Sequence, residues 1–269
     1  MRACYRVAMA NILKFLAKDA LYTLRRVGAG AREGGVILVY HSIADNQLFF
    51  TVSPAMFEQQ MAWLKSAGFN VVSLNRLMEL RANGHIPAKT VAITFDDGYK
   101  DNLTNAFPVL KKYGFPATIF VTTSDLGSTR VVREVSFDIL SEGDIRELEA
   151  GGVAIEPHTM THPKLTETPL MEVLKEISGS KAMLERILNK TCEHFAYPKG
   201  RYNADVIQAT KTAGVKFAYG TRDGFVLSAA SPSPTADYEI PRNGINCETT
   251  MAQFKGIATG GRMTRDSII

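Results

Sequence analysis

Short apolar runs rich in β-branched and aromatic residues alternate along the chain with longer segments of helical periodicity. The eight expected strands are residues 36–40, 70–74, 90–95, 117–122, 153–156, 194–198, 216–220 and 238–241. Strands that alternate with helices form a mainly parallel sheet, because a parallel connection needs a long crossover and a helix supplies it. The pattern therefore predicts an α/β fold, either closed as a (β/α) barrel or open and doubly wound.

Residues typical of helix starts lie between these runs. The expected N-cap residues are Ser53, Ser141, Thr168 and Asn203, with Pro54 and Pro169 directly after the first and third. Such side chains accept a hydrogen bond from the first turn of a helix, and proline is tolerated at its first position. Residues 123–140 form a longer excursion between two strands that could overhang a site.

Positive charge is concentrated at the start of the chain. The 269 residues have a formal net charge of +4 and are 45% hydrophobic and 22% charged, which is an ordinary globular composition. Residues 1–32 carry seven basic residues against one acidic residue, so the remaining residues have a balance of −2. The body of the protein therefore has no overall attraction for nucleic acid.

The basic segment is amphipathic, with apolar positions on one helical face and basic residues on the opposite face. We expect residues 1–34 to form a helix outside the main domain, residues 35–269. This helix either packs on the body or contacts a membrane surface through residues 7–27. Its polar interruptions argue against a secretory signal, and no apolar run is long enough to span a bilayer. We therefore expect a cytoplasmic protein, peripheral to the membrane if the helix binds lipid.

Polar residues capable of chemistry follow three of the predicted strands. His41 follows the first strand, Asp96 and Asp97 follow residues 90–95, and His158 and His162 follow residues 153–156. Ligands of parallel α/β folds bind at the carboxyl ends of the strands. These five side chains are therefore the candidate site. The three cysteines are widely spaced and indicate neither a disulfide framework nor a zinc ribbon.

The two histidines suit a single metal ion. Pro163 disfavours helix at His162, so we expect a turn rather than a helix to bring His162 to His158. Two histidines and one carboxylate form a hydrolytic zinc site or a non-haem iron site. Taken alone, this histidine spacing is more often structural, and two adjacent acids can equally be a solvated turn or part of a calcium loop.

Together with the histidines, the two acids acquire separate roles. Successive residues of an extended chain point in opposite directions, so one aspartate can ligate the metal while the other takes a proton from the attacking water. The charge of the metal would offset the repulsion between the carboxylates. Gly98 permits a sharp turn with positive φ. His41 at the same edge is a candidate general acid.

Three motifs resemble those of the NodB-like polysaccharide deacetylases, carbohydrate esterase family 4. They are "TFDDG" (94–98), "HTMTH" (158–162) and "FAYPKG" (195–200), in this order. The wider pattern, from "VYHSI" near residue 40 to "EIPRNGI" near the end, is most similar to the poly-N-acetylglucosamine deacetylase branch and covers residues 35–258. The resemblance implies a distorted (β/α) barrel of about seven to eight strands that removes acetyl from an N-acetylated sugar with a metal ion.

The resemblance also implies a role for each residue of the motifs. Asp97, His158 and His162 would hold zinc or a similar divalent ion, and Asp96 would be the base. The backbone N–H of Tyr197 would stabilise the oxyanion, because Pro198 has no N–H. Most members supply the acid histidine late in the chain; here "VILVYHS" fits that strand and makes His41 the acid.

The chain departs from the family pattern at several positions. Ala196 stands where many members have an arginine that pairs with the base, so Arg242 is the expected cation beside Asp96. Lys199 replaces a frequently aromatic residue, and Glu156 and Pro157 are unusual before His158. These differences concern the substrate more than the reaction.

The expected substrate is an N-acetylated oligosaccharide or polysaccharide, such as a cell-envelope glycan precursor, lipid-linked if the N-terminal helix binds membrane. Three alternatives stay open at this point: a catalytically silent carbohydrate-binding relative, an iron-dependent oxygenase with the same ligands, and a hydrolase of another N-acyl group.

Overall fold

The computed structural model describes residues 33–46, 48–228 and 235–260. The predicted N-terminal helix, residues 1–34, lies almost entirely outside this part of the chain, so the helix and its membrane contact through residues 7–27 stay predictions. Within the described ranges, every helix is too short or too polar to cross a bilayer.

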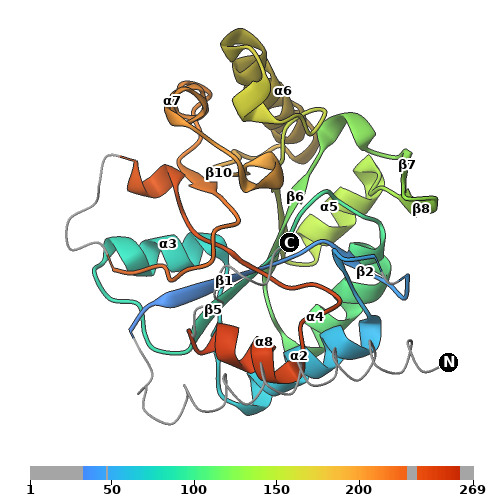
Figure 1. The fold of residues 1–269 in the computed structure, drawn as a ribbon, viewed down its shortest axis with the longest axis vertical. Coiled ribbons are helices and arrows are strands. Elements are labelled where there is room, and N and C mark those ends of the chain that lie inside the picture. The colour runs from blue at the N-terminus through green and yellow to red at the C-terminus, as the bar shows by residue number, and fades with distance from the viewer. Residues whose placement is uncertain (1–32, 47, 229–234, 261–269) are drawn as a thin grey trace, which may run out of the picture.

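The elements follow one another as strand and helix units (Figure 1). The strands are β1 (Gly35–Tyr40), β2 (Ser42–Ile43), β3 (Thr51–Val52), β4 (Asn70–Val71), β5 (Thr90–Phe95), β6 (Ala117–Val121), β7 (Thr129–Val132), β8 (Val135–Asp138), β9 (Val153–Pro157), β10 (His194–Ala196), β11 (Phe217–Tyr219) and β12 (Asn243–Gly244). The helices are α2 (Pro54–Ser66), α3 (Leu74–Ala82), α4 (Phe107–Tyr113), α5 (Glu142–Ala150), α6 (Leu170–Leu188), α7 (Ala204–Thr212) and α8 (Met251–Ala258). Short 3₁₀ turns span Thr123–Asp125, Leu165–Glu167, Pro198–Gly200 and Ala236–Tyr238, and a π-helical segment spans Asn102–Ala106.

The main sheet is parallel and has the order β12–β1–β5–β6–β9, with β4 paired to the start of β5. β10 and β11 form a separate parallel pair, and a bridge between Tyr219 and Ile240 joins β11 to the chain just before β12. In the described part of the chain, no backbone ladder joins β9 to β10. β9 and β10 lie next to each other without a ladder, so a seam separates them, and among the described residues hydrogen bonds do not close the strands into a barrel. The predicted parallel α/β fold is confirmed.

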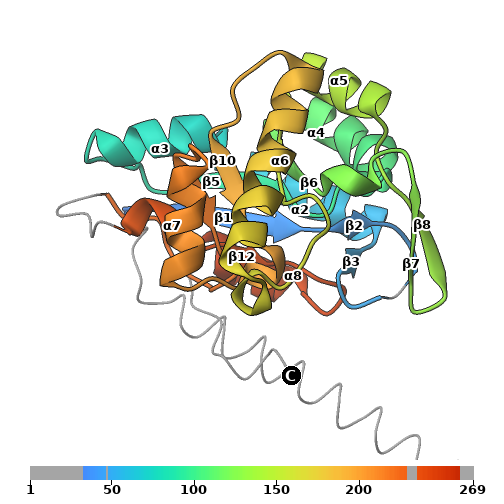
Figure 2. The same ribbon diagram turned by 90° about the horizontal axis from the view of Figure 1, so that it is seen from above.

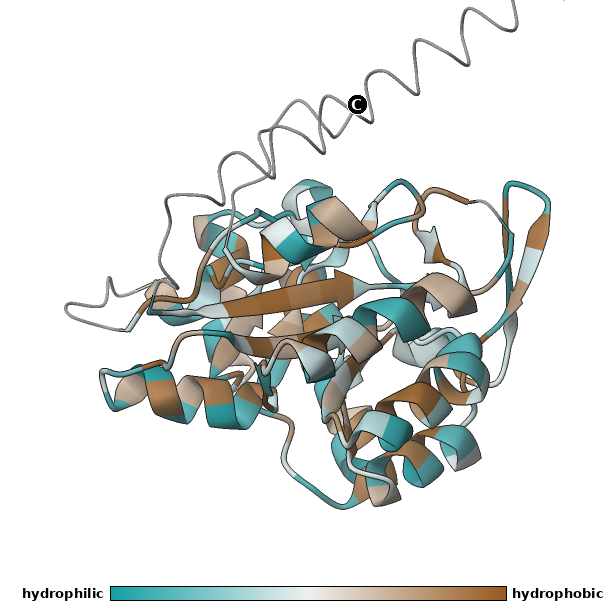
Figure 3. Cartoon of the chain, turned by 90° about the horizontal axis from the view of Figure 1, so that it is seen from below, coloured by the Kyte–Doolittle hydropathy of each residue, from teal (hydrophilic) through white to brown (hydrophobic). Residues whose placement is uncertain are grey.

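Alternate residues of the strands pack into two cores. Val36, Leu38 and Tyr40 of β1 pack with apolar residues of α2 and α8, whereas Ile37 packs with residues of β5, β6, β10 and β11. This alternation is that of a barrel wall, with one face toward the helices and the other toward the interior. Figure 3 shows the central strands as hydrophobic and the outer faces of the helices as largely hydrophilic.

Most of the predicted boundaries agree with the structure. Ser53, Ser141 and Asn203 each accept a hydrogen bond from the first turn of their helix. Thr168 does not cap α6, because Pro169 occupies the N-cap position and the helix starts at Leu170.

The predicted strand 238–241 is reduced to the bridge at Ile240. A 3₁₀ turn precedes it, and Pro241 after it has no N–H to donate to a ladder. Pairing with β1 begins only at Asn243, in β12.

The excursion 123–140 contains an antiparallel hairpin of β7 and β8 at the edge of the molecule (Figure 2). Backbone hydrogen bonds from Gly127 to Leu140 and from Ile139 to Ser128 close the base of this hairpin. A bridge between Tyr99 and Ile139 joins it to the loop that follows β5. The hairpin therefore lies next to the carboxyl end of β5.

Candidate active site

The loop after β5 separates the two adjacent aspartates. Asp96 continues the strand and donates its N–H to the carbonyl of Tyr40, whereas Asp97 has a φ of 72° and Gly98 a φ of 80°. The side chains of Asp96 and Asp97 diverge because the backbone is left-handed at Asp97. The alternation of side chains along an extended strand, which we expected, is not the cause. A Cβ at Gly98 would lie only 3.0 Å from Cγ1 of Val121, so this turn needs glycine for two reasons.

Asp97, His158 and His162 form one group, with a possible ligand atom of each within 4.8 Å of the others. Oδ1 of Asp97 lies 3.4 Å from Nε2 of His162 and 4.0 Å from Nε2 of His158. This buried oxygen accepts no hydrogen bond within the described residues. A carboxylate oxygen that accepts no hydrogen bond and faces two imidazole nitrogens fits a divalent ion, because the ion would coordinate all three atoms.

A tight loop rather than a helix brings the two histidines together, as predicted. Thr159 and His162 have φ values of 70° and 58°, and the hydroxyl of Thr159 accepts a hydrogen bond from the N–H of His162. Glu176 of α6 accepts hydrogen bonds from the N–H groups of Met160 and Thr161, and so fixes the loop from outside. No pattern in the sequence points to Glu176.

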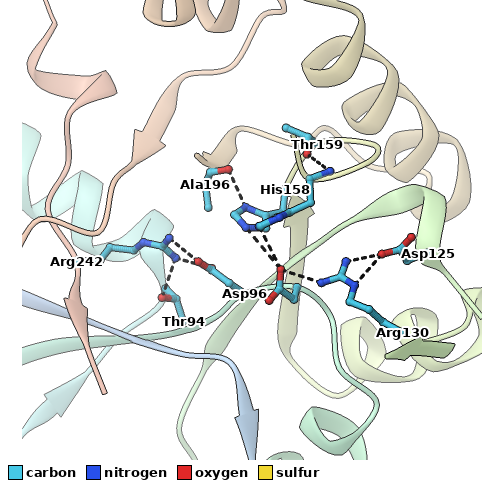
Figure 4. A network of polar contacts seen from close by, with 10 residues as sticks. Thr94, Asp96, Asp125, Arg130, His158, Thr159, Ala196 and Arg242 are labelled. Carbon is cyan, nitrogen blue, oxygen red and sulfur yellow. Dashed lines mark hydrogen bonds and ion pairs between the residues drawn. The ribbon is translucent and has the colours of Figure 1, made fainter. Parts of the chain in front are cut away.

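Burial disfavours the charged form of both imidazoles. Burial lowers the pKa of His158, and burial followed by the charge of His158 lowers the pKa of His162 to about 4. Nδ1 of His158 lies 2.8 Å from the carbonyl oxygen of Ala196 (Figure 4). Nδ1 must therefore carry the proton, which leaves the lone pair of Nε2 directed at Asp97.

The structure pairs Asp96 with Arg242. The two guanidinium NH groups donate to the two carboxylate oxygens at 2.6 and 2.7 Å, and Nε of Arg242 donates to the carbonyl of Gly220 at 3.0 Å. The arginine is fully buried and lies over the ring of Phe120. Burial alone would raise the pKa of Asp96, but the charges of Arg242 and His158 outweigh it and lower the pKa.

Arg130 of β7 is a cation of the site that the sequence reasoning missed. Its NH1 lies 3.3 Å from Oδ1 of Asp97, while Nε and NH2 donate to Asp125 (Figure 4). Burial would raise the pKa of Asp97, but His41, the two other histidines and Arg130 lower it to about 2. The only sequence signal for this contact is the length of the excursion 123–140.

His41 lies at the same edge of the sheet. It follows β1 directly, and its charge lowers the pKa of both Asp96 and Asp97. Asn102 donates a hydrogen bond of 2.7 Å to the carbonyl of His41 and so fixes the backbone there. All five side chains selected from the sequence therefore gather at one end of the strands.

The assignment of the oxyanion donor to Tyr197 was wrong. The N–H of Tyr197 donates to the carbonyl of Tyr219 at 3.0 Å, so it belongs to the pairing of β10 with β11. Lys199, two residues later, has a φ of 57° and lies in the 3₁₀ turn that follows β10. Its N–H, at the carboxyl end of β10, is the candidate donor of the segment.

Four of the eight non-glycine residues with positive φ in the described ranges lie in the loops of the site. Asp97, Thr159, His162 and Lys199 all have positive φ values, and they lie in the loops that follow β5, β9 and β10. For non-glycine residues this conformation costs about 1–3 kcal/mol each and persists only where the surroundings enforce it. The loops of the site are therefore strained, as is common where a geometry serves a function.

Comparisons with known proteins agree with this geometry. Residues 83–218 match the polysaccharide deacetylase family. YxkH of Bacillus subtilis is 32% identical over 189 residues, covering 70% of this chain and 64% of that protein. The poly-β-1,6-N-acetyl-D-glucosamine N-deacetylase of Staphylococcus aureus is 30% identical over 203 residues, covering 72% of this chain and 67% of that protein. The chain thus spans about two thirds of the length of these two relatives.

A solved structure has the same fold. The Streptococcus pyogenes deacetylase PplD, solved in complex with acetate, matches with a TM-score of 0.72 and 28% identity, over 85% of this chain and 99% of that chain.

Proposed function

The chain belongs to the polysaccharide deacetylase family, and on that premise we propose that it is a metal-dependent N-deacetylase of an N-acetylated glycan. The observation that carries the proposal is the division of labour between two adjacent carboxylates. Asp97 faces His158 and His162 with an oxygen that accepts no hydrogen bond, while Arg242 holds Asp96 apart from that group. Hydrolysis of an amide needs both a place for the metal and a separate base.

Asp97, His158 and His162 would hold the ion, and zinc fits two neutral imidazoles and one carboxylate. A bound zinc ion supplies Lewis-acid polarisation of the acetamide carbonyl and favours ionisation of the attacking water.

The protein residues move the protons. Asp96 accepts the proton of the water that adds to the carbonyl carbon. His41 donates a proton to the sugar nitrogen as the C–N bond breaks, so the products are acetate and a free amine. The N–H of Lys199 donates to the oxygen that becomes negative. Arg242 keeps Asp96 ionised and fixes both of its oxygens, so that the base is in its active form at neutral pH.

The substrate class comes from the relatives. The Staphylococcus aureus relative is named for poly-β-1,6-N-acetyl-D-glucosamine, and the Streptococcus pyogenes deacetylase is described with acetate, the acid that this reaction would release. We propose an N-acetylhexosamine within an oligosaccharide or polysaccharide, including a lipid-linked precursor. A second N-acyl group, such as formyl, would fit the same chemistry.

Acetate release tests this proposal. The protein loaded with zinc is incubated with free, oligomeric, polymeric and lipid-linked N-acetylated sugars, and acetate and formate are measured together. We expect acetate from at least one glycan and a loss of at least 10³-fold for Asp96→Asn, with bound zinc unchanged. Unchanged activity of Asp96→Asn would exclude this base, and absence of acetate from every substrate would favour a non-catalytic carbohydrate-binding relative.

A further inference from the structure

The open seam between β9 and β10 is spanned by side chains where a backbone ladder is missing. Oε2 of Glu156 in β9 accepts the N–H of His194 in β10 at 3.1 Å. Oε2 of Glu149 in α5 accepts the N–H of Ile155 in β9 at 3.1 Å. Buried N–H groups need an acceptor. Here carboxylates accept the N–H groups of Ile155 and His194, which have no ladder partner across the seam.

A lysine joins these two carboxylates. Nζ of Lys190 donates to Glu149 at 2.5 and 3.1 Å and lies 3.7 Å from Oε1 of Glu156. Glu156 is only 4% exposed, and this burial raises its pKa to about 7 although the charge of Lys190 lowers it. Glu149, Lys190 and Glu156 together form a clamp, which we call the seam clamp, across the edge of β9.

Packing is incomplete at this level of the seam. A cavity of about 310 Å³ lies there, lined among others by Thr118, Ala154, Glu156 and His194. Without a ladder at this point, the contact of Glu156 with the N–H of His194 and that of His158 with the carbonyl of Ala196 link the β9 segment to β10.

The same seam carries the hydrogen bond that orients a metal ligand. His158 lies two residues beyond Glu156 in sequence, and Ala196 lies two residues beyond His194. Nδ1 of His158 donates to the carbonyl of Ala196 at 2.8 Å, so the two contacts are successive rungs between the same segments. Residues two apart on a strand are about 6.6 Å apart and share a face. A shift of β10 at His194 would therefore move the carbonyl of Ala196 relative to His158.

We propose that Glu156 is a positioning residue of the metal site: by holding the N–H of His194 across the seam, it places the carbonyl that fixes the tautomer and direction of His158. This inference rests on the metal group of the proposed function, but not on the identity of the substrate or on catalysis. It assigns a task to a residue that is unusual at this place in the motif.

Two readouts without any sugar test the inference. The first is the tautomer of His158 in the metal-free protein, measured by ¹⁵N NMR of the imidazoles. The second is the affinity for zinc, measured by competition with a chromophoric chelator. The variants are Glu156→Met, which removes the acceptor at similar size, and Glu156→Gln, which keeps an oxygen for the N–H of His194.

For Glu156→Met we expect a mixture of the two His158 tautomers and a zinc affinity about tenfold lower, which is the usual size of effects on groups that orient metal ligands. For Glu156→Gln we expect the tautomer of the unmodified protein and an affinity within about threefold. The matched control is Glu193→Gln, which lines the same cavity but pairs with Lys216 at the surface and should change neither readout.

Lys190→Met provides a second route if Glu156→Met does not fold, because it weakens the seam clamp and leaves Glu156 in place. We expect the same direction of change with a smaller amplitude. Unchanged tautomer and affinity in the folded variants would overturn the inference. A defect in Glu156→Gln as large as that in Glu156→Met would also overturn it, because the charge rather than the acceptor would then be responsible. A lack of acetate release in the unmodified protein would affect only the proposed function.

Discussion

Arg242 and Asp96 form a buried bidentate ion pair, although 146 residues separate them in sequence. The arginine comes from the residue just before β12, whereas Ala196 of β10 leaves the position of the family arginine without a charge. The base of the proposed reaction is thus paired from a different strand. Since both side chains are buried, water cannot solvate either charge if its partner is removed.

Removal of this arginine should destabilise the protein. In Arg242→Met, the carboxylate of Asp96 stays buried without its partner, which costs about 3–5 kcal/mol of unfolding free energy. Arg242→Lys should recover only part of it, because an ammonium group lacks the planar pair of N–H donors that matches both carboxylate oxygens. Urea denaturation measures both. The double variant Asp96→Asn/Arg242→Met should be more stable than Arg242→Met alone; additive effects would show that the pair has no coupling energy.

Arg130 should weaken metal binding. Its guanidinium group lies 3.3 Å from the Asp97 oxygen that faces the histidines and is also held by Asp125, so it stays near any bound cation. Coulomb repulsion at an effective dielectric constant of about 20, reduced by partial exposure, predicts roughly tenfold tighter zinc binding for Arg130→Gln. Arg130→Lys keeps the charge and serves as the control. Weaker binding by Arg130→Gln would mean that the arginine orients Asp97 instead.

Gly98 should tolerate no side chain. Gly98→Ala combines a left-handed backbone with a contact of 3.0 Å to Val121, and we expect a loss of about 2–4 kcal/mol in unfolding free energy. Gly114→Ala is the matched control, because Gly114 has a φ of 69° but no atom within 4 Å of the added Cβ. Its loss should be about 1 kcal/mol. Thermal and urea denaturation measure both losses. If Gly98→Ala and Gly114→Ala lost the same unfolding free energy, the steric part of this explanation would be contradicted.

Mild acid should destabilise the fold through His194. Burial lowers the pKa of this imidazole to about 4, and both of its nitrogens are engaged, with the hydroxyl of Tyr219 and the amide oxygen of Asn75. The unfolded chain binds the proton near pH 6.5 and the folded protein only near pH 4. The contribution of His194 to stability is therefore complete above pH 6.5 and is lost as the pH falls toward 4, by up to about 3 kcal/mol.

This acid effect can be assigned to one residue by urea denaturation between pH 7 and pH 4, with a chelator present. The unfolding free energy of His194→Gln should be lower at pH 7 and should fall less steeply between pH 6.5 and 4. His85→Gln, at an exposed position, should keep the slope of the unmodified protein. An unchanged slope in His194→Gln would show that other groups cause the acid sensitivity.

The sequence was informative where the candidate metal ligands and the candidate base follow a buried strand. Asp96, Asp97, His158 and His162 were found because each comes just after an apolar run, and the ends of parallel strands converge. Arg130 and Glu176 were missed because their contacts depend on how a hairpin and a helix pack on the loops. Such contacts have no local pattern.

The error at Tyr197 has a related cause. Which N–H groups of a strand point to a neighbouring strand depends on the register of pairing, and a shift of one residue exchanges them. The sequence of "FAYPKG" does not specify that register. Arg242 was selected only by elimination, since Ala196 removed the usual partner and Arg242 followed the last predicted strand.

The β7–β8 hairpin has a consequence for protein engineering. It lies outside the barrel sheet, its base is closed by its own backbone hydrogen bonds, and it brings Arg130 to the metal group. Residues 129–136 of this hairpin can be exchanged as a cassette, whereas Phe137 and Ile139 should be kept because they pack with Tyr99 of the loop after β5. Libraries of such cassettes would vary the charge beside the metal independently of the ligands, so metal preference can be selected while the catalytic residues stay constant.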